Sequence, residues 1–404
     1  MRTRSAVLLA ALAVPSFALA AHAGPAPNSQ DVTVKVAGHI TELRVDGDVS
    51  NVKLTPSSAS VVKAHLEWTM SKPNLSVSAS KGVLTVKVRC DDRVSGGGVY
   101  VSLGALCVDD LTIAVPAGAK LGIKTGGEVI ASSFTGPADL NGASINVTDL
   151  SGPSVMLHST VGDITARQIT TQALQMTPYS GSVNADHLNA RSLTVSSANG
   201  DVALSDVTSS TLKVTASAGG VSLSRVHADS VSGSSYNGTV TAQDVRAVRT
   251  TLGSGSGDVS AQRVTSSRLD VSSGNGYVTI ADVQVARTDA RSQSGDVSVQ
   301  RLRGARVDAS SGNGYVTVSD VHVRVVSAHS SSGDVSIQDL DVPDTTSATS
   351  NNGNVSVRVP SGRYYVQATS NNGQVHTTGL TFDRFASREI TATSSSGDVS
   401  VTGV

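Results

Sequence analysis

Apolar and polar residues alternate along most of this chain in short runs with a period of two. In one representative stretch, Val297–Val299 and Val307–Ser311 alternate apolar or small residues with polar ones, and the parity breaks before Leu302. This pattern predicts two short strands with a bend at Gln300–Arg301 and a polar turn at Arg303–Arg306. A sustained apolar spacing of three and four residues is missing from the mature chain, so we expect almost no helix.

The same pattern recurs about every 19 residues, marked by a glycine, then a small or polar residue, then Val or Ile. The interval is constant from Gly162 to Gly333 and lengthens near the C-terminus. The glycines of this repeat are Gly162, Gly181, Gly200, Gly219, Gly238, Gly257, Gly276, Gly295, Gly314, Gly333, Gly353, Gly373 and Gly397. A fixed period of this length is typical of a solenoid, whose repeats bury their apolar faces by stacking. We therefore predict an all-β fold, a parallel β-solenoid (β-helix-like) with about 19 residues per coil and coils about 4.8 Å apart.

Two positions in the repeat have a predicted structural role. The glycine itself is expected where positive φ or close stacking excludes a side chain. The position six residues after it alternates between acid and base, in the series Asp206, Arg225, Asp244, Arg263, Asp282, Arg301, Asp320 and Asp339. Stacked coils would bring opposite charges together at each step from Asp206 to Asp320, which disfavours a slip of one coil. We interpret this series as a register device, with a track for a charged ligand as the alternative.

The N-terminal residues predict export. Arg2 and Arg4 precede an apolar run at Ala6–Ala20, and small residues suit cleavage after Ala20 or Ala23. We read residues 1–23 as a signal peptide, because the apolar run is too short to span a membrane comfortably. A periplasm is the simplest destination, with the cell surface or secretion as alternatives. We expect no transmembrane span elsewhere.

Residues 24–110 differ from the repeats and are predicted to form an N-terminal β cap, and residues 111–404 the solenoid. The segment holds the single Trp68 and both cysteines of the chain. A cap is expected because an uncovered solenoid end exposes strand edges. In an oxidising compartment, Cys90 and Cys107 are predicted to form a disulfide across the Gly-rich stretch between them.

Composition excludes several functions. The formal net charge is −1, aromatic residues make up 3% of the chain, and basic and aromatic residues are not interleaved, so we expect no nucleic-acid partner. Histidines are scattered without metal-ligand spacing, and the Gly-Asp turns occur once per coil, too rarely for a calcium-binding β-roll. We predict no metal, no cofactor and no catalytic residue.

One column of residues is a candidate binding surface. The residue after the repeat glycine is Asp258, Tyr277, Asp296, Tyr315 and Asp334 in five successive coils. Asn275 and Asn313 lie close by in the sequence. Tyrosine rings stack on sugars, and Asp and Asn accept hydroxyl hydrogen bonds, so this column suits a glycan. The alternative is structural, with Tyr filling a corner and Asp capping a turn.

Two segments resemble the bacterial putative-adhesin family of β-strand-repeat proteins, a family of unknown function. The resemblance rests on Asp110–Leu121 with Gly127–Val129, and on Val355–Val366 running into Ser370–Gly373. Each combines a Val-Pro turn, a polar loop and a Gly-x-Val coil. The resemblance covers roughly residues 110–404 and implies a β-solenoid at the cell envelope, without catalytic residues to carry over.

These observations predict a non-enzymatic, exported solenoid that acts as an adhesin-like or envelope scaffold protein. Its expected partner is a surface glycan or a protein. The alternative is a polysaccharide-active β-helix enzyme, a hydrolase or lyase, which would cut the polymer that the long face binds. The sequence makes no prediction about oligomeric state.

Overall fold

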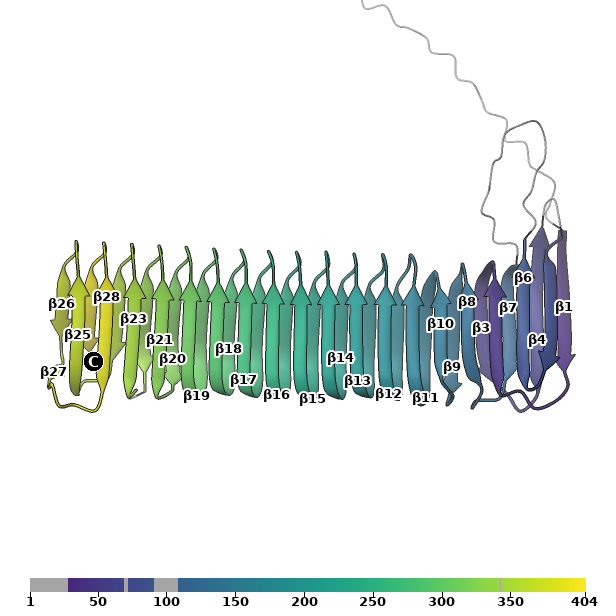
Figure 1. Ribbon diagram of the computed structural model, residues 1–404, viewed down its shortest axis with the longest axis horizontal. Coiled ribbons are helices and arrows are strands. Elements are labelled where there is room, and N and C mark those ends of the chain that lie inside the picture. Colours follow the sequence, from purple (N-terminus) through teal and green to yellow (C-terminus); the bar gives the residue numbers. More distant parts are fainter. Residues whose placement is uncertain (1–27, 69–71, 91–107, 342) are drawn as a thin grey trace, which may run out of the picture.

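The computed structural model describes residues 28–68, 72–90, 108–341 and 343–404, and its regular structure consists of β-strands alone. Figure 1 shows these strands as one straight stack of flattened coils, with the N-terminal strands at one end and the C-terminal strands at the other. The predicted all-β parallel solenoid is confirmed. The described part of the chain contains no helix that could span a bilayer.

The strands fall into three groups along the stack. The first group is β1 (Asn28–Val36), β2 (Glu42–Gly47), β3 (Val49–Pro56), β4 (Ser60–Trp68), β5 (Asn74–Ser80), β6 (Val83–Arg89), β7 (Val108–Val115), β8 (Lys120–Thr125), β9 (Glu128–Phe134) and β10 (Ala138–Gly142). The central group is β11 (Ser144–Ser159), β12 (Ile164–Pro178), β13 (Val183–Ser197), β14 (Val202–Ala216), β15 (Val221–Ser235), β16 (Val240–Ser254), β17 (Val259–Ser273), β18 (Val278–Ser292) and β19 (Val297–Ser311). The last group is β20 (Val316–His322), β21 (Val325–Ser330), β22 (Val335–Leu340), β23 (Thr345–Ser350), β24 (Val355–Val359), β25 (Arg363–Ser370), β26 (Val375–Thr378), β27 (Thr381–Phe382), β28 (Glu389–Ser394) and β29 (Val399–Gly403).

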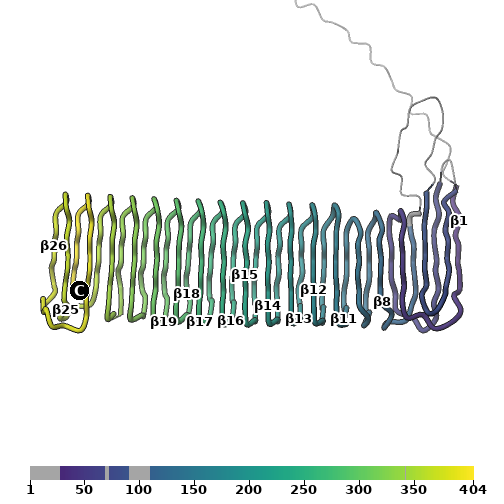
Figure 2. Tube along the Cα trace, in the orientation of Figure 1, coloured from purple at the N-terminus to yellow at the C-terminus, as the bar shows by residue number. Residues whose placement is uncertain are grey.

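Each central strand makes one coil and pairs in parallel with the next strand at an offset of one sequence repeat. Val259 pairs with Val278, which pairs with Val297 in the following coil. Equivalent residues therefore form columns along the stack, and the apolar columns are buried inside the coils. The tube in Figure 2 shows these coils following one another along the long axis of the molecule. Each coil is therefore stabilised mainly by its two neighbours.

The predicted bend within each coil is present, but it does not divide the coil into separate strands. Arg301 has a φ of 48°, in the left-handed region, and this reverses the parity so that Val299 and Leu302 both face the core. Pairing between coils skips Arg301 and Ala305 and continues on either side. The two predicted strands are therefore one continuously paired strand, because the neighbouring coil bends at the same place.

The repeat glycine is explained by close stacking and not by positive φ. None of the repeat glycines has a positive φ. A Cβ atom on Gly276 would instead overlap the backbone carbonyl group of Gly257 in the preceding coil. The same overlap recurs along the column, so the glycines allow the turns to pack backbone against backbone.

The N-terminal end of the stack contains antiparallel pairs, which the coils lack. Strand β1 pairs antiparallel with β4, β4 with β7, and β5 with β6. Strands β2 and β3 connect this arrangement to the coils through parallel pairing with β8 and β9. The N-terminal end is therefore a β segment distinct from the coils, as the sequence predicts.

At the C-terminal end, the order of the coils in space differs from their order in the sequence. Strand β28 lies between β23 and β25, and β29 lies between β24 and β26. Residues 389–403 therefore form the penultimate coil, and residues 363–378 form the outermost one. The glycine intervals are longer here because the chain first forms the outermost coil and then returns to form the coil beneath it.

The close stacking predicts that Gly276→Ala destabilises the protein by about 1–3 kcal/mol, because the new methyl group overpacks against a backbone carbonyl. Chemical denaturation would measure this. Gly253→Ala is the matched control, since its new Cβ would lie 3.4 Å from the nearest atom, Ser272 Oγ. Equal midpoints for the two variants would contradict the stacking role of Gly276.

Candidate functional site

The turn that carries the repeat glycine is held in place by a serine three residues before it. Ser273 Oγ donates to the carbonyl oxygen of Gly257 in the preceding coil at 2.9 Å, and accepts from the N–H of Gly276 in its own coil at 2.8 Å. The same two bonds recur at Ser235, Ser254, Ser292, Ser311, Ser330, Ser350, Ser370 and Ser394. We call the surface formed by residues from two before to one after each repeat glycine the glycine-turn edge.

The predicted column lies on this edge, one residue per coil. Asp258 Oδ1 accepts from the backbone N–H of Tyr277 at 2.8 Å, and Asp296 Oδ1 accepts from that of Tyr315 at 2.8 Å. Asp334 makes the equivalent bond in the next coil, at 2.7 Å. Each aspartate therefore has a structural role, because one carboxylate oxygen links its coil to the next. The second oxygen is left for other contacts.

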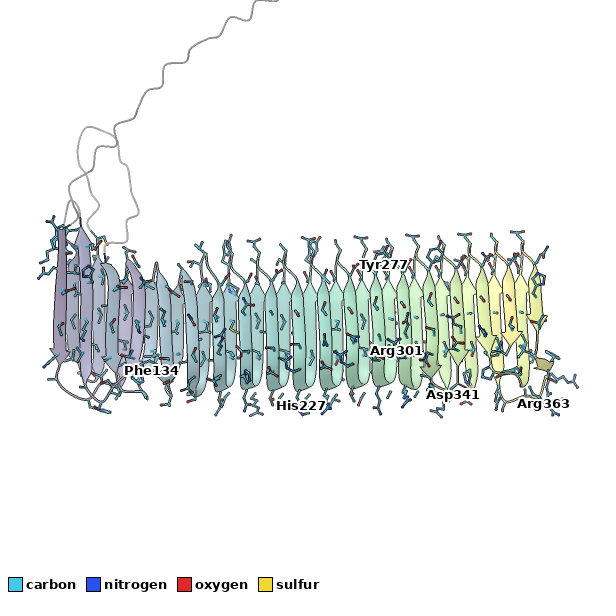
Figure 3. All side chains as sticks on the ribbon, turned by 180° about the vertical axis from the view of Figure 1, so that it is seen from behind. Phe134, His227, Tyr277, Arg301, Asp341 and Arg363 are labelled. Carbon is cyan, nitrogen blue, oxygen red and sulfur yellow. The ribbon has the colours of Figure 1, made fainter. Side chains whose placement is uncertain are left out.

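The two tyrosines of the column project into solvent. Tyr277 and Tyr315 are each 56% exposed, and Figure 3 shows Tyr277 at the edge of the stack where the coils turn. More than half of each side chain is therefore available for other contacts. Their rings are separated by two coils, about 9.6 Å.

The structure adds two more tyrosines to the same edge. Tyr179 and Tyr236 lie two residues before their repeat glycines and are 65% and 72% exposed. The column predicted from the sequence does not include these two tyrosines, because it consists of the residue directly after each glycine. The sequence could have indicated them, because a residue two positions before the repeat glycine belongs to the same turn as the residue directly after it.

A second edge contains the alternating charges. Arg225, Arg263 and Arg301 each hold the aspartate of the preceding coil with Nε and Nη2, at 2.6 Å for the Nε bond. Each of these arginines and its aspartate has a left-handed φ of 48° to 57°. The ladder is therefore a series of three bidentate pairs at the bend of the coil. We call this surface the bend edge.

The ion pairs change the acidity of their carboxyl groups. The hydrogen bonds from Arg225, Arg263 and Arg301 hold the pKa of Asp206, Asp244 and Asp282 below its ordinary value. Because these groups are exposed, each pair contributes little to stability and is weakened by salt.

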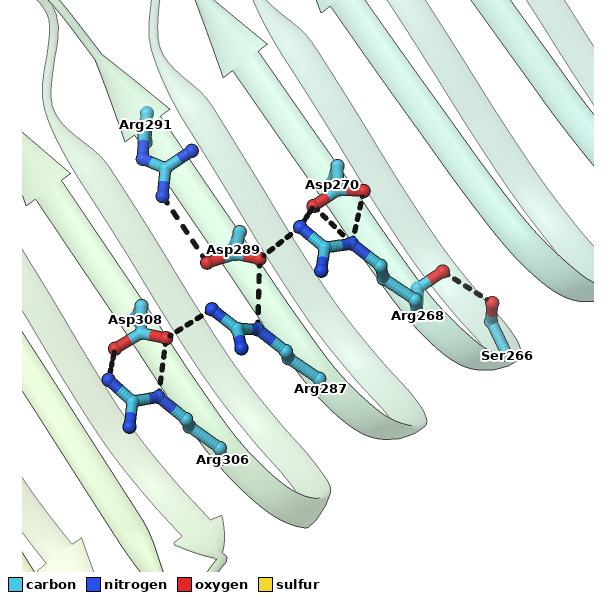
Figure 4. Close-up of polar contacts among 8 residues, drawn as sticks. All are labelled: Ser266, Arg268, Asp270, Arg287, Asp289, Arg291, Arg306 and Asp308. Carbon is cyan, nitrogen blue, oxygen red and sulfur yellow. Dashed lines mark hydrogen bonds and ion pairs between the residues drawn. The ribbon is translucent and has the colours of Figure 1, made fainter.

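A third ionic cluster covers the flat face formed by the second half of the coils (Figure 4). The carboxylate of Asp289 is 1% exposed and contacts Arg268 Nη2 at 2.9 Å, Arg287 Nε at 3.3 Å and Arg291 Nη2 at 3.3 Å. Hydrogen bonds from Arg268 also lower the pKa of Asp270. These carboxylates are saturated by arginine, so the cluster is suited to joining coils and not to proton transfer.

Two further kinds of site concern the predicted absence of a metal and the predicted disulfide. Within the residues 28–68, 72–90, 108–341 and 343–404, no group of three or more His, Cys, Asp or Glu side chains could hold a metal ion. Cys90 Sγ lies 3.9 Å from the carbonyl oxygen of Asp48. Cys107 lies outside the described residues, so its pairing with Cys90 stays a prediction.

The sequence matches the family described as Toastrack DUF4097 over residues 40–243, 214–341 and 250–402. The chain belongs to this family. The match covers both the N-terminal strands and the coils, and it confirms the family resemblance inferred from the Val-Pro turns and Gly-x-Val coils. The Toastrack chain matches no curated protein.

Several solved structures are similar to this Toastrack protein at low identity. A putative adhesin from Bacteroides fragilis NCTC 9343 is 15% identical, with a TM-score of 0.28, over 63% of this chain and 96% of its own. A putative adhesin from Parabacteroides merdae ATCC 43184 is 12% identical, with a TM-score of 0.23, over 78% and 97%. A putative lipid binding protein from Parabacteroides distasonis ATCC 8503 is 11% identical, with a TM-score of 0.21, over 78% and 98%.

The ladder predicts a salt-dependent effect of Asp282→Arg. The change removes the pair with Arg301 and places three arginines in successive coils, so we expect a modest drop in melting temperature at low salt that shrinks at high salt. Asp229→Arg is the control, because Asp229 is exposed and has no ion pair in the described structure. Identical low-salt melting curves for both variants would contradict a stacked ladder.

The lowered aspartate pKa values also predict acid sensitivity. A depressed folded-state pKa stabilises the protein above the ordinary aspartate value of about 3.9, and this contribution is lost as the pH falls through the folded value. We expect D206N/D244N/D282N to melt below the parent at pH 7, and the difference to shrink as the pH falls below about 3.9. Thermal melts across this range would measure the difference. A constant difference at every pH would count against the pairs.

Proposed function

We propose that this Toastrack protein is an exported, non-enzymatic, adhesin-like rod of the cell envelope that binds a glycan or protein partner along its glycine-turn edge. The predicted signal peptide at residues 1–23 supports export. The partner is expected to be an extended polymer or a long surface, because the edge is a straight row and not an enclosed pocket.

The observation that carries this proposal is the row of exposed tyrosines. Tyr179, Tyr236, Tyr277 and Tyr315 project from one edge over seven coil steps, about 34 Å. Exposed tyrosines presented by a rigid backbone supply large contact areas at low entropic cost. At the turns of Tyr236, Tyr277 and Tyr315, the bonds of Ser235, Ser273 and Ser311 fix the backbone from which the ring projects, so little ordering is needed on binding.

The aspartates of the edge support a binding role over hydrolysis. A glycosidase needs two carboxyl groups in different environments, one acting as acid and the other as base or nucleophile. Asp258 and Asp296 have the same environment, since each accepts a hydrogen bond from the backbone N–H of the next coil at 2.8 Å. The repeated geometry gives neither residue a distinct role.

We predict that Tyr277→Ala combined with Tyr315→Ala weakens retention on an envelope glycan or membrane-protein fraction roughly tenfold without lowering the melting temperature. Adding Tyr179→Ala and Tyr236→Ala should weaken it further. Co-sedimentation with isolated envelope fractions, before and after protease or glycosidase treatment, measures the effect and separates the two partner classes.

The control is Phe382→Ala with Phe385→Ala, which removes two exposed aromatic rings, 64% and 81% exposed, at the C-terminal end of the stack. An equal loss of retention in the control and in the tyrosine variant would mean that non-specific adsorption by exposed aromatic rings explains the retention. New reducing ends released from a polysaccharide by the parent protein would overturn the non-enzymatic assignment.

A further inference from the structure

A groove runs along the bend edge, beside the charge ladder. It encloses about 790 Å³ and extends over six successive coils, a length of about 24 Å. One wall consists of the ladder residues. The floor is closed by buried side chains such as Val226 and Val283. The other wall is a column of exposed residues two positions after the ladder, formed by His227, Arg246, Thr265, Gln284, Arg303 and His322.

The lining of the groove is basic although the protein as a whole is nearly neutral. Five arginines and three aspartates line it. The ladder arginines are engaged by aspartates of the preceding coils. Arg246 and Arg303 are exposed and have no ion pair among the described residues. They lie three coils apart, about 14 Å, and extend the positive charge along the groove.

The residues between these two arginines are uncharged and hydrogen-bonding. Thr265 and Gln284 occupy the intervening coils and offer both donors and acceptors. No Phe, Tyr or Trp lines the groove, so bases of a nucleic acid would have no stacking partner. The apolar lining residues are buried, which leaves no pocket for an apolar peptide side chain.

We infer that this groove binds an acidic polysaccharide whose chain runs parallel to the rod axis. Arg246 and Arg303 pair with carboxylate groups of the polymer, and Thr265 and Gln284 hydrogen-bond to the sugar hydroxyls between them. The site is separate from the tyrosine row, because Figure 3 shows Tyr277 and His227 at opposite edges of the stack. The protein thus has two binding edges with different chemistry.

The test compares two double variants that lose the same charge. Arg246→Gln with Arg303→Gln removes the unpaired arginines of the groove. Arg191→Gln with Arg358→Gln is the matched control, since both of these arginines are exposed, lie outside the groove and have no ion pair in the described structure. Binding of polygalacturonate, a uronic-acid polymer, is measured by titration with the purified protein at low and moderate salt, with neutral dextran and polyglutamate as further probes.

We expect the parent to bind polygalacturonate but not dextran, and the groove variant to bind roughly tenfold more weakly. The control variant should stay within about twofold of the parent, and moderate salt should weaken parental binding. Equal affinity of both double variants for polygalacturonate, or no binding of polygalacturonate by the parent, would overturn the proposal that the groove is a binding site. Equally tight, groove-dependent binding of polyglutamate would show that charge alone is recognised and would overturn the polysaccharide assignment.

The tyrosine variant keeps this proposal distinct from the proposed function. Tyr277→Ala with Tyr315→Ala should leave polygalacturonate affinity unchanged, because those residues lie on the opposite edge. A loss of polygalacturonate binding in that variant would place the polymer on the glycine-turn edge and contradict the groove. Equal melting temperatures of all variants would confirm that each is folded.

Discussion

Backbone contact between successive coils at the repeat glycines is the constraint on which the rest of the structure depends. A side chain at Gly276 would overlap Gly257, so only glycine lets the turns stack at the spacing that strand pairing requires. Once that spacing is fixed, every other column follows. Valines meet valines in the core, serines reach the carbonyl groups below them, and arginines reach the aspartates of the preceding coil.

Stacking also explains why the surface chemistry is arranged in rows. A residue type that recurs at one repeat position becomes a line parallel to the rod axis. The glycine-turn edge and the bend edge are formed by different positions of the repeat, so they carry different residue types. The glycine-turn edge displays tyrosines that are supported by aspartate-to-backbone bonds. The bend edge combines paired and unpaired arginines. Regular scaffolds of this kind place binding groups at multiples of one coil spacing, which suits a repetitive polymer.

Most of the fold could be predicted from the sequence because it is local and repeated. The regular glycine interval, the inward valines and the bend near Arg301 are each visible in the sequence of adjacent coils. The C-terminal order could not be predicted, since the coils at Gly353, Gly373 and Gly397 have similar patterns and any of them could stack on another. The sequence suggests a charged-ligand track along the ladder only as an alternative. It does not single out Arg246 and Arg303, because they are three repeats apart in the sequence and a near-zero net charge conceals a local column.

The inserted coil at the C-terminal end has a consequence for the order in which the coils can fold. Residues 363–378 leave the ribosome before residues 389–403, yet in the folded stack they rest on that later segment. Growth of the rod by adding each new coil to the previous one therefore stops after β24. The outermost coil acquires its native neighbour only when the later segment enters between them, so the two last coils of this end are expected to form together and not one after the other.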